Sequence, residues 1–599
     1  MSEAAFGQVQ DVPGVPTPAH AEPATQGLTR AWRPRTQEPD STPPLLDRVL
    51  TARGLTDDAE SFMNPSLKAL HEPNRIPDLQ RAADRIIQAI QNRETIAIFG
   101  DYDVDGVTAS AILIHTIRAI DPQANLISYI PHRVDEGYGL NCDAIRTLHS
   151  QGVSLIVSVD CGITAHEPAK TAREIGLDLI ITDHHNPPAS IDELPDAYAV
   201  VHPRRPDSTY PFGELCGAGV AYKLAWHLCT LHCGSQRVSP ALRTVLVEML
   251  GFAALGSIAD VVPLLDENRV IVKHGLRQIP HTRNEGVQAL IAASGLDSNK
   301  IDTEDVGFRL APRLNAIGRL GHAAEALELM TNATGSEAAR LAERLSKIND
   351  ERKSIGEAIY AQAEEMAINA GMVGPDRRAI VLAHEEWHPG VVGIVCSRLV
   401  ERYARPVILM QRDGEVCKGS GRSIDGFNLH AGLDACAEHL IGYGGHDMAA
   451  GMRCQSEHFD LFAEAFVAHT NQRLSPDDLV NTTRYDTTAR VRELTPESVR
   501  ELERLAPFGA GNPRVQIRIV HAKLNGTPSP FGRGGNHLSL RVCDRDGAGP
   551  GWRVVAWNWA KHIDQIPPGA PVELIIEPKV SDWNGRISVE PVLVDLRVC

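Results

Sequence analysis

The sequence has no excess of positive charge, no long apolar run and no recognisable leader. Its 59 lysines and arginines face 76 aspartates and glutamates, a net charge of −17. This balance argues against a protein that coats nucleic acid with positive charge. It does not exclude a nucleic-acid enzyme, because carboxylates that hold metal ions count as negative. No stretch of about 18 uncharged apolar residues occurs, so we expect no membrane span. The opening residues MSEAAFGQVQ have neither a basic nor an apolar region, so we predict no signal peptide.

Cysteine is also scarce, at 11 of 599 residues, and the number is odd. A reduced, cytoplasmic protein is the simplest interpretation. Cys229 and Cys233 lie near His227 and His232, which leaves a structural zinc site as an alternative. No second half with zinc-ligand spacing follows this group, so we favour the end of a helix.

A chain of 599 residues predicts three or four domains. Residues 1–44 are rich in Pro, Ala, Thr and Gln, which predicts a disordered tail. Short apolar runs alternate with helical stretches from about 94 to 205, which predicts a parallel sheet covered on both faces. A long amphipathic helix at 338–366 precedes a second α/β block at 378–467. Short alternating runs between 515 and 598 predict a small β-barrel.

Polar residues follow three predicted strands at the point where each strand ends. The strands lead into Asp101–Gly106 (DYDVDG), Asp160–Gly162 (DCG) and Asp183–His185 (DHH), and a predicted buried helix at 241–259 ends at Asp260. Ligands of parallel α/β sheets bind beyond the carboxyl ends of the strands. We therefore expect these carboxylates and imidazoles to share one crevice.

Clustered carboxylates raise one another's pKa unless cations neutralise them. Several aspartates with one or two histidines form the ligand set of Mn²⁺ or Mg²⁺. A bridging carboxylate can hold two such ions about 3.5–4 Å apart, an arrangement suited to phosphoryl displacement. Each motif alone has a plainer interpretation: Asp103–Gly106 as a turn cap or part of a calcium loop, His184 and His185 as loop surface, and Asp160 as a helix N-cap. Their joint placement favours a metal site.

At this point the residues match a known pattern. The series GDYDVDG, VSVDCG, DHH and GSIADVVPL resembles the DHH phosphoesterase superfamily. Within it, further segments resemble the RecJ-type single-strand-specific exonucleases in their order: FMNPSL, EGYGL, APRLNAIGRL, WHPGVVGIVCSRLVERYARPVIL, GSGRSIDGFNLH, GGHDMAAG and PFGAGNP. The resemblance covers about residues 45–599.

The resemblance implies an α/β protein with four parts after the tail. These are a DHH-type parallel-sheet domain at 45–330, a connecting helix at 331–373, a DHHA1-type α/β domain at 374–470, and a linker with an OB-like β-barrel at 471–599. It also implies hydrolysis of single-stranded DNA from the 5′ end to 5′-mononucleotides, in recombination and repair, with Mn²⁺ or Mg²⁺ in a two-metal site. The implied metal ligands are Asp101, Asp103, Asp105, Asp160, His184 and Asp260, with Asp160 as the bridge. His185 would face the scissile phosphate and, with Asp105 and Asp160, carry the catalysis.

Substrate contacts are implied in two places. In the DHHA1-like domain they are Ser420, Arg422, Gly444, Gly445 and His446. Glycine lets backbone N–H groups approach an anion, and arginine grips a phosphate with two hydrogen bonds. In the DHH-like domain, Arg133 is a candidate for the 5′-terminal phosphate, whose capture would explain the polarity. Arg313, Asn315 and Arg319 line the same groove or, with equal weight, form a structural hydrogen-bond network.

The C-terminal barrel carries 11 lysines and arginines and 8 aspartates and glutamates over 513–599, a net charge of +3 that would attract a DNA strand. Trp557, Trp559 and Trp583 are candidates for stacking on bases, with barrel core as the alternative. Strand alternation places Trp557 and Trp559 on one face.

Two other functions stay open. One is a phosphodiesterase for short oligonucleotides or cyclic dinucleotides, against which the barrel and PFGAGNP argue. The other is a non-catalytic DNA-binding scaffold, against which the complete carboxylate and histidine set argues. We expect a monomer that acts on single strands with a 5′ end, alongside a single-strand-binding protein and a helicase.

Overall fold

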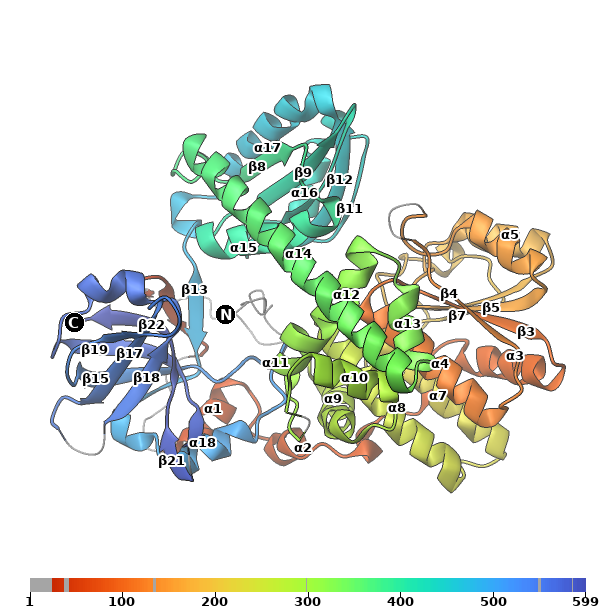
Figure 1. Ribbon diagram of the computed structural model, residues 1–599, viewed down its shortest axis with the longest axis horizontal. Coiled ribbons are helices and arrows are strands. Elements are labelled where there is room, and N and C mark those ends of the chain that lie inside the picture. The colour runs from red at the N-terminus through yellow and green to blue at the C-terminus, as the bar shows by residue number, and fades with distance from the viewer. Residues whose placement is uncertain (1–23, 37–42, 133–135, 298, 548–550, 584) are drawn as a thin grey trace. The chain divides into compact units, whose positions relative to one another are not determined.

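The computed structural model describes residues 24–36, 43–132, 136–297, 299–547, 551–583 and 585–599 (Figure 1). The chain divides into two compact units. Unit A contains residues 65–355 together with the short segment Pro507–Asn512. Unit B contains the other described residues.

Unit A is built on a five-stranded, fully parallel sheet in the order β4-β3-β5-β6-β7. Its strands are β3 (Thr95–Gly100), β4 (Leu126–Tyr129), β5 (Val153–Val159), β6 (Asp178–Thr182) and β7 (Ala199–Val201). All five lie within residues 94–205, where the sequence predicts short strands that alternate with helices. Their carboxyl ends meet at one edge, and the polar motifs follow there.

Four strands of this sheet are buried on both faces, as their nearly continuous apolar sequences require, while the edge strand β4 is only partly buried. On β3, Ile96 and Ile98 join one core, while Ala97 and Phe99 join the other. The first core contains α3 (Leu79–Gln91), α4 (Val104–Ile120), α7 (Gly217–Cys233) and α8 (Pro240–Ala259). The second contains α5 (Cys142–Ser150) and α6 (His166–Glu174). The predicted parallel sheet covered on both faces is confirmed.

Helix α8 is the one described helix that is long and apolar enough to cross a membrane, with 67% of its most apolar 18-residue window buried in the structure. It packs against α4, α7 and α9 (Asp266–Gln278). A core helix has the same composition as a span, so the apolar sequence of α8 is explained by burial within unit A.

The remaining helices of unit A follow the sheet in sequence. They are α10 (Glu285–Ala293), α11 (Thr303–Asp305), the π-helical turn η5 (Val306–Leu310), α12 (Ala311–Leu320) and α13 (Ala324–Thr331). The long helix α14 (Gly335–Asn369) begins in unit A and ends in unit B, and is drawn in green in Figure 1. It lies within the range predicted for the connecting helix.

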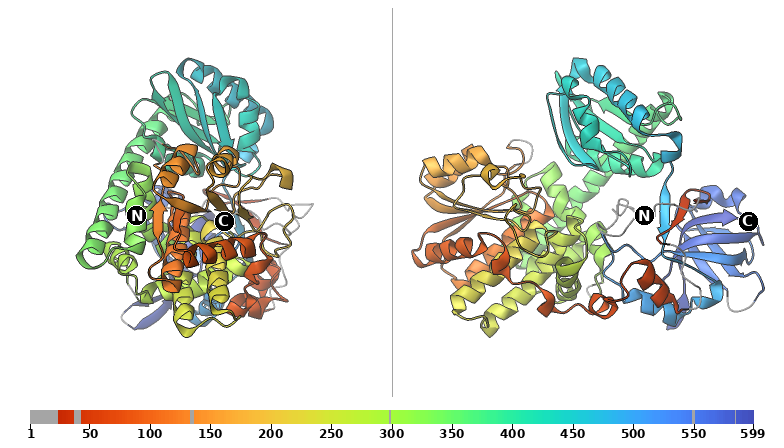
Figure 2. Two further views of the ribbon diagram at one scale, coloured as in Figure 1. Left: turned by 90° about the vertical axis from the view of Figure 1, so that its right-hand side faces the viewer. Right: turned by 180° about the vertical axis from the view of Figure 1, so that it is seen from behind.

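Unit B begins its first α/β part with a mixed sheet in the order β11-β12-β10-β9-β8, in which only β8 and β9 are parallel. The strands are β8 (Ile380–His384), β9 (Val407–Asp413), β10 (Val416–Arg422), β11 (Gly442–Gly445) and β12 (Ala449–Gln455). Helix α15 (Pro389–Tyr403) packs on β9 and β10, and α16 (Leu429–Asp434) and α17 (Phe459–Arg473) contribute to the core on the sheet's other side (Figures 1 and 2).

The C-terminal part of unit B is a β-barrel in the order β15-β19-β22-β18-β17, closed by pairing of β17 with β15. Its strands are β15 (Ile517–Leu524), β17 (His537–Asp544), β18 (Trp552–Ala556), β19 (Pro571–Glu577) and β22 (Val592–Val598). Closure leaves no free edge among these strands. The predicted small barrel is confirmed.

The N-terminal segment differs from the expectation of a tail that ends at residue 44. β1 (Thr25–Gln26) pairs with β2 (Ala31–Pro34), and β2 pairs with β13 (Thr482–Tyr485). Trp32 is 1% exposed, and its indole N–H donates to buried Asp595 over 2.7 Å. One large aromatic side chain therefore anchors a segment that its average composition marks as unstructured. Residues 1–23 and 37–42 lie outside the described residues.

The start of the parallel-sheet domain also differs from the predicted residue 45, because unit A begins at Pro65. Helix α1 (Leu45–Ala52) belongs to unit B, because Arg48 and Arg53 contact residues more than 400 positions away. Asp486 is 3% exposed and holds Arg35 at 3.0 Å and Arg53 at 2.8 Å. Such long-range ion pairs leave no trace in the local periodicity of residues 45–70.

We expect Asp486→Asn to destabilise unit B by about 3–5 kcal/mol, because it leaves Arg53 buried without its counter-charge. Burial raises the pKa of Asp486, but Arg53 and Arg35 outweigh burial and lower it. A carboxyl whose folded pKa is lowered stabilises the fold above its unfolded pKa of about 3.9 and loses that contribution as the pH falls. Calorimetric unfolding of the full chain should therefore show a large deficit at pH 7 that shrinks toward pH 3. Asp477→Asn, at an exposed position of the same unit, should show neither effect.

Candidate metal centre

The motifs at the strand ends converge on one cluster in unit A. Three sets of ligand atoms each lie within 4.8 Å of one another: Asp101, Asp103 and Asp160; Asp105, His184 and Asp260; and Asp160, His184 and His185. Asp160 and His184 each belong to two of the sets. Every residue predicted as a metal ligand is therefore in the cluster. In the described part of the chain, Cys229 and Cys233 are in no such set, and Cys233 ends helix α7.

His184 lies at the middle of this cluster. Its Nε2 atom is 3.2 Å from Asp160 Oδ1, 3.6 Å from Asp260 Oδ2 and 3.8 Å from Asp105 Oδ2. Neither His184 Nε2 nor Asp160 Oδ1 makes a hydrogen bond within the protein, although both atoms are buried. Buried polar atoms are nearly always paired, so these two atoms fit the role of ligands.

The cluster is held by backbone groups from distant elements. Gly217 N and Ala218 N, at the start of α7, donate to the two carboxylate oxygens of Asp105 over 2.6 and 2.8 Å. A Cβ atom on Gly217 would lie 2.6 Å from Asp160 Cβ, and one on Gly256 would lie 2.5 Å from Asp105 Oδ1. These two glycines leave the space in which the carboxylates sit. Gly256 begins the motif GSIADVVPL and Gly217 lies in none of the motifs, but the role of both depends on tertiary contacts that the sequence does not show.

Asp160 itself has a left-handed backbone, with φ of +62°. This conformation is uncommon for residues other than glycine, although aspartate and asparagine adopt it more readily than most. Its N–H donates to Thr182 O over 3.0 Å, which ties the end of β5 to the end of β6. Strain of this kind persists where surrounding structure enforces it, and it is frequent at functional sites.

The charges of the cluster are unfavourable without a cation. Burial and the neighbouring carboxylates of Asp105, Asp103 and Asp101 raise the pKa of Asp160 well above its usual range. Burial likewise raises the pKa values of Asp105 and Asp260, and it lowers the pKa of His184 to about 4. The metal-free site therefore favours protonated carboxyls and a neutral imidazole. Divalent cations would replace those protons, so the donor set fits Mn²⁺ or Mg²⁺.

Asp183 orients both histidines, a role that the sequence-based set of site residues omitted. It is 1% exposed and accepts hydrogen bonds from His184 N at 2.7 Å, His185 N at 3.1 Å and Ile163 N at 2.9 Å. It also accepts from His185 Nδ1 at 2.8 Å. Burial opposes ionisation of His185, but the bond to Asp183 outweighs it and raises the pKa of His185 to about 9. The place of Asp183 as the first residue of the DHH motif was the feature of the sequence that could have indicated this role.

Asn315 lies beside the cluster, but its contact is with the protein. Its Oδ1 accepts from Val104 N over 3.0 Å, at the first turn of α4. On the same helix, a Cβ atom on Gly318 would lie 2.6 Å from Tyr102 O. Helix α12 therefore packs directly on the loop that carries Asp101 to Asp105. Arg313 donates to Ser346 Oγ and Arg309 O, which favours the structural network over substrate contact for this residue. Arg319 lies near the end of the same helix.

We expect Asn315→Ala to weaken metal use rather than DNA binding. Loss of the acceptor leaves Val104 N unsatisfied, at a cost of about 1–3 kcal/mol, and loosens the loop. The Mn²⁺ concentration for half-maximal activity should rise about tenfold, a typical cost of altering a residue behind a metal ligand. Asn284→Ala removes an equivalent helix cap on α10 and should leave Mn²⁺ dependence unchanged. A rise in the KM for DNA alone would instead favour a substrate contact.

The residues predicted to hold substrate in the second domain share one sheet. Ser420 on β10 pairs with Gly451 on β12, which pairs with Gly444 on β11. Arg422 ends β10, and Gly445, with φ of +141°, ends β11 before His446. The side chains of Ser420 and Arg422 face Gly393 of α15, where an added Cβ would lie 3.3 Å from Ser420 Oγ. Arg133 lies outside the described residues.

Trp557 and Trp559 of the barrel differ in exposure, although the predicted strand alternation places them on one face. Trp557 is 42% exposed and contacts His537, with ring centroids 4.8 Å apart, whereas Trp559 is 7% exposed. β18 ends at Ala556 and Asn558 has φ of +60°, so the two side chains do not share a strand face. The expectation of a common face is wrong for this reason. Trp583 ends β20 (Val580–Trp583).

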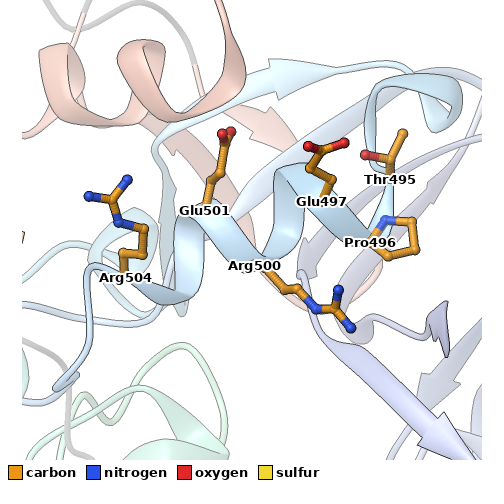
Figure 3. Close-up of a pocket in the computed structure, with 6 residues that line it drawn as sticks. All are labelled: Thr495, Pro496, Glu497, Arg500, Glu501 and Arg504. Atoms are coloured by element: carbon orange, nitrogen blue, oxygen red, sulfur yellow. The ribbon is translucent and has the colours of Figure 1, made fainter. Parts of the chain in front are cut away.

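A surface hollow on unit B lies along α18 (Pro496–Glu503) and is drawn in Figure 3. Its lining residues are Thr495, Pro496, Glu497, Arg500, Glu501 and Arg504. Glu497 and Glu501 project to the side of the helix opposite Arg500 (Figure 3). The residues that line this hollow include no histidine and form none of the candidate ligand sets.

Comparisons with known proteins cover nearly the whole chain. Family models match at residues 95–256 (DHH family, N-terminal domain), 376–471 (DHHA1 domain) and 485–595 (RecJ OB domain). The single-stranded-DNA-specific exonuclease RecJ of Escherichia coli is 30% identical over 93% of this chain and 96% of its own length. The chain belongs to the RecJ family.

Other RecJ proteins are similar to this chain in sequence and in structure. RecJ of Bacillus subtilis is 39% identical over 93% of this chain and 68% of its own length. The crystal structure of RecJ from Thermus thermophilus in complex with Mn²⁺ has a TM-score of 0.77 and 31% identity, covering 95% of this chain and 79% of that one. The same RecJ in complex with Mg²⁺ gives a TM-score of 0.71 at 30% identity, covering 95% of this chain and 78% of that one. The α/β class with DHH, DHHA1 and OB parts, predicted from the motifs, is confirmed.

Proposed function

We propose that this RecJ-family chain is a metal-dependent exonuclease that hydrolyses single-stranded DNA from the 5′ end to 5′-mononucleotides. The observation that carries the proposal is the meeting of Asp105, Asp160, His184 and Asp260 at the sheet edge, with two unpaired ligand atoms at its middle. The names and metal-bound structures of the relatives support it. Its biological setting would be recombination and repair.

We assign two Mn²⁺ or Mg²⁺ ions to the cluster. Asp160 is the bridge in this assignment, because it belongs to two ligand sets and lies between Asp101 and Asp103 on one side and His184 on the other. A bound pair of divalent ions stabilises charge on the reacting phosphate and lowers the pKa of a coordinated water. Asp105 and Asp260, together with His184, complete the second set.

His185 is assigned the role of facing the scissile phosphate. Its Nδ1 is bound to Asp183 at 2.8 Å, and its side chain is 38% exposed, so Nε2 is the atom that can reach a phosphate oxygen. In the metal-free site burial opposes the charge of His185, but the bond to Asp183 outweighs it and raises the pKa of His185 to about 9. It would donate a hydrogen bond to the phosphate and hold it for in-line attack.

The sheet of unit B is assigned to substrate holding, through Ser420, Arg422 and the Gly444–Gly445–His446 turn. Arg133 stays our candidate for the 5′-terminal phosphate. We place the protein in the cytoplasm, since all eleven cysteines are free thiols. A single-strand-binding protein and a helicase stay proposed partners.

The test uses the full chain with Mn²⁺ and one oligonucleotide labelled at either end. We expect a 5′ label to be released first as a mononucleotide, while a 3′ label persists until late in digestion and blunt duplex DNA stays intact. Early release of the 3′ label would contradict the polarity. Cleavage of dinucleotides alone would favour the oligonucleotide phosphodiesterase, and no cleavage with either ion would favour the scaffold.

A further inference from the structure

The segment Pro507–Asn512 (PFGAGN) lies between α18 and β15 in sequence, yet it packs with unit A. The residues on both sides of it, up to Ala506 and from Pro513 onward, belong to unit B. Six residues thus leave one unit, join the other and return. No residue of this segment is among the proposed metal ligands, although PFGAGNP is one of the motifs by which the chain resembles its family.

The segment forms a closed turn with its own internal hydrogen bonds. Gly509 N donates to Asn512 O over 2.9 Å, and Asn512 N donates back to Gly509 O over 3.1 Å. Asn512 is 2% exposed, and its Nδ2 donates to Pro507 O over 2.8 Å. Gly511 has φ of +71°, which favours glycine. The turn therefore enters unit A with a fixed shape.

The partner of the turn is the loop 261–265, which directly follows the ligand Asp260. Leu264 N donates to Ala510 O over 2.7 Å. A Cβ atom on Gly511 would lie 3.1 Å from Pro263 Cβ and 3.2 Å from Leu265 Cδ1. The backbone of the turn is therefore pressed against three successive residues of the loop, so closely that an added Cβ would force its neighbours to shift by a few tenths of an ångström.

Two buried side chains of unit A fix the other side of the turn. Arg269 Nη1 donates to Pro507 O over 3.3 Å, and Thr303 Oγ1 donates to Phe508 O over 2.7 Å. Arg269 and Thr303 are 2% and 5% exposed. The turn is therefore bound to unit A through three elements: the loop 261–265, α9 through Arg269 and α11 through Thr303.

The loop held in this way determines where Asp260 sits. Asp260 caps the end of α8, and the next residue, Val261, has φ of +60° although it is β-branched. Such a residue is strained, and it keeps this conformation only if its surroundings enforce it. On its far side the loop is bonded to Ala510, so a relaxed loop would let Asp260 move from its place 3.6 Å from His184 Nε2.

We propose that the turn Pro507–Asn512 is a positioning element for the metal ligand Asp260. It acts through Leu264 and its neighbours and touches neither metal nor substrate. The inference rests on the proposed metal site. It means that Asp260 is held in place by a segment that lies more than 240 residues later in the sequence, between α18 and β15.

The test compares Gly511→Ala with Gly569→Ala in the full chain. Both glycines have nearly the same backbone, with φ of +71° and +73°, but an added Cβ meets Pro263 and Leu265 at Gly511 and nothing within 4 Å at Gly569. Isothermal titration with Mn²⁺ alone should give a dissociation constant about tenfold or more higher for Gly511→Ala, a usual effect of disturbing a ligand's support. Gly569→Ala should match the natural protein in Mn²⁺ affinity, and its thermal stability in EDTA should fall by less than that of Gly511→Ala, because it carries the backbone strain without the added contacts.

Equal Mn²⁺ affinity in the two glycine variants would overturn the positioning role. If the natural protein itself fails to bind Mn²⁺, the proposed metal site fails and not merely its support. Should Gly511→Ala not fold, Thr303→Val removes the hydroxyl that donates to Phe508 O while keeping the side chain's shape. We expect that variant to weaken Mn²⁺ binding about threefold with little change in the KM for DNA; unchanged binding would again contradict the proposal.

Discussion

Replacing Asp160 by Asn is expected to abolish nuclease activity and, in the absence of metal, to raise the stability of the protein. Activity should fall by at least about 10³-fold, because the carboxylate that we propose as the bridge would position ions that contribute several kcal/mol, and each 1.36 kcal/mol is tenfold in rate. Asparagine is the right substitution here, since it tolerates the φ of +62° that Asp160 adopts. Alanine would add backbone strain and confuse the two effects.

The stability gain follows from the raised pKa of Asp160. Burial and the charges of Asp105 and Asp103 disfavour its ionised form. A neutral amide of the same shape avoids this repulsion and takes up no proton at neutral pH, so the unfolding temperature in EDTA should increase, by about 1–2 °C for each kcal/mol gained in a unit of this size. Mn²⁺ should stabilise the natural protein and not the variant, because only the native site binds it tightly.

Asp143→Asn is the matched control for this experiment, since the Asp143 side chain is 96% exposed in the same unit. It should change neither activity nor the response to Mn²⁺. An Asp160→Asn protein that keeps its activity, or that is less stable than the natural protein in EDTA, would contradict the account of a repulsive cluster relieved by cations.

The second large effect is expected from Asp183→Asn. The carboxylate accepts four N–H groups, and an amide presents its own NH₂ to one of them, so at least one hydrogen bond is lost. His185 also loses the negative charge that raises its pKa. Activity and Mn²⁺ affinity should each fall about 10–100-fold, because both histidines lose their orientation.

Asp178→Asn is a close control for this variant. Asp178 begins strand β6, while Asp183 follows its end, and Asp178 pairs with Arg85 at 2.7 Å with 41% of its side chain exposed. Its loss should lower stability slightly and leave kcat and Mn²⁺ affinity as they are. If Asp178→Asn and Asp183→Asn lowered activity equally, general destabilisation would explain the result instead.

The meeting of these carboxylates and imidazoles could be predicted from the sequence because most of them follow strand ends. A buried strand, a turn residue and a carboxylate are local patterns, and the parallel topology then brings Asp105, Asp160 and His184 to one edge. Asp260 could be included in the predicted cluster because the apolar helix that precedes it is also recognisable from the sequence. The resemblance to a family narrowed the substrate class, which no spacing alone would have done.

Features that depend on tertiary approach could not be predicted in this way. Gly217 and Gly256 matter because a Cβ would enter the space of Asp160 or Asp105, and no local pattern reports that distance. For Asn315 the sequence left a substrate groove and a structural hydrogen-bond network as equal alternatives, and only the structure shows that its side chain accepts from Val104 N. Trp32 and Asp486 organise unit B through partners that lie hundreds of residues away.

A crystal of the natural protein soaked in Mn²⁺ and measured at the manganese absorption edge tests the central claim most directly. We expect two anomalous peaks about 3.5–4 Å apart, with Asp160 bridging them and Asp105, His184 and Asp260 around one. A single peak would contradict the two-ion assignment. Peaks elsewhere, with these four side chains bound only to protein atoms, would contradict the account as a whole.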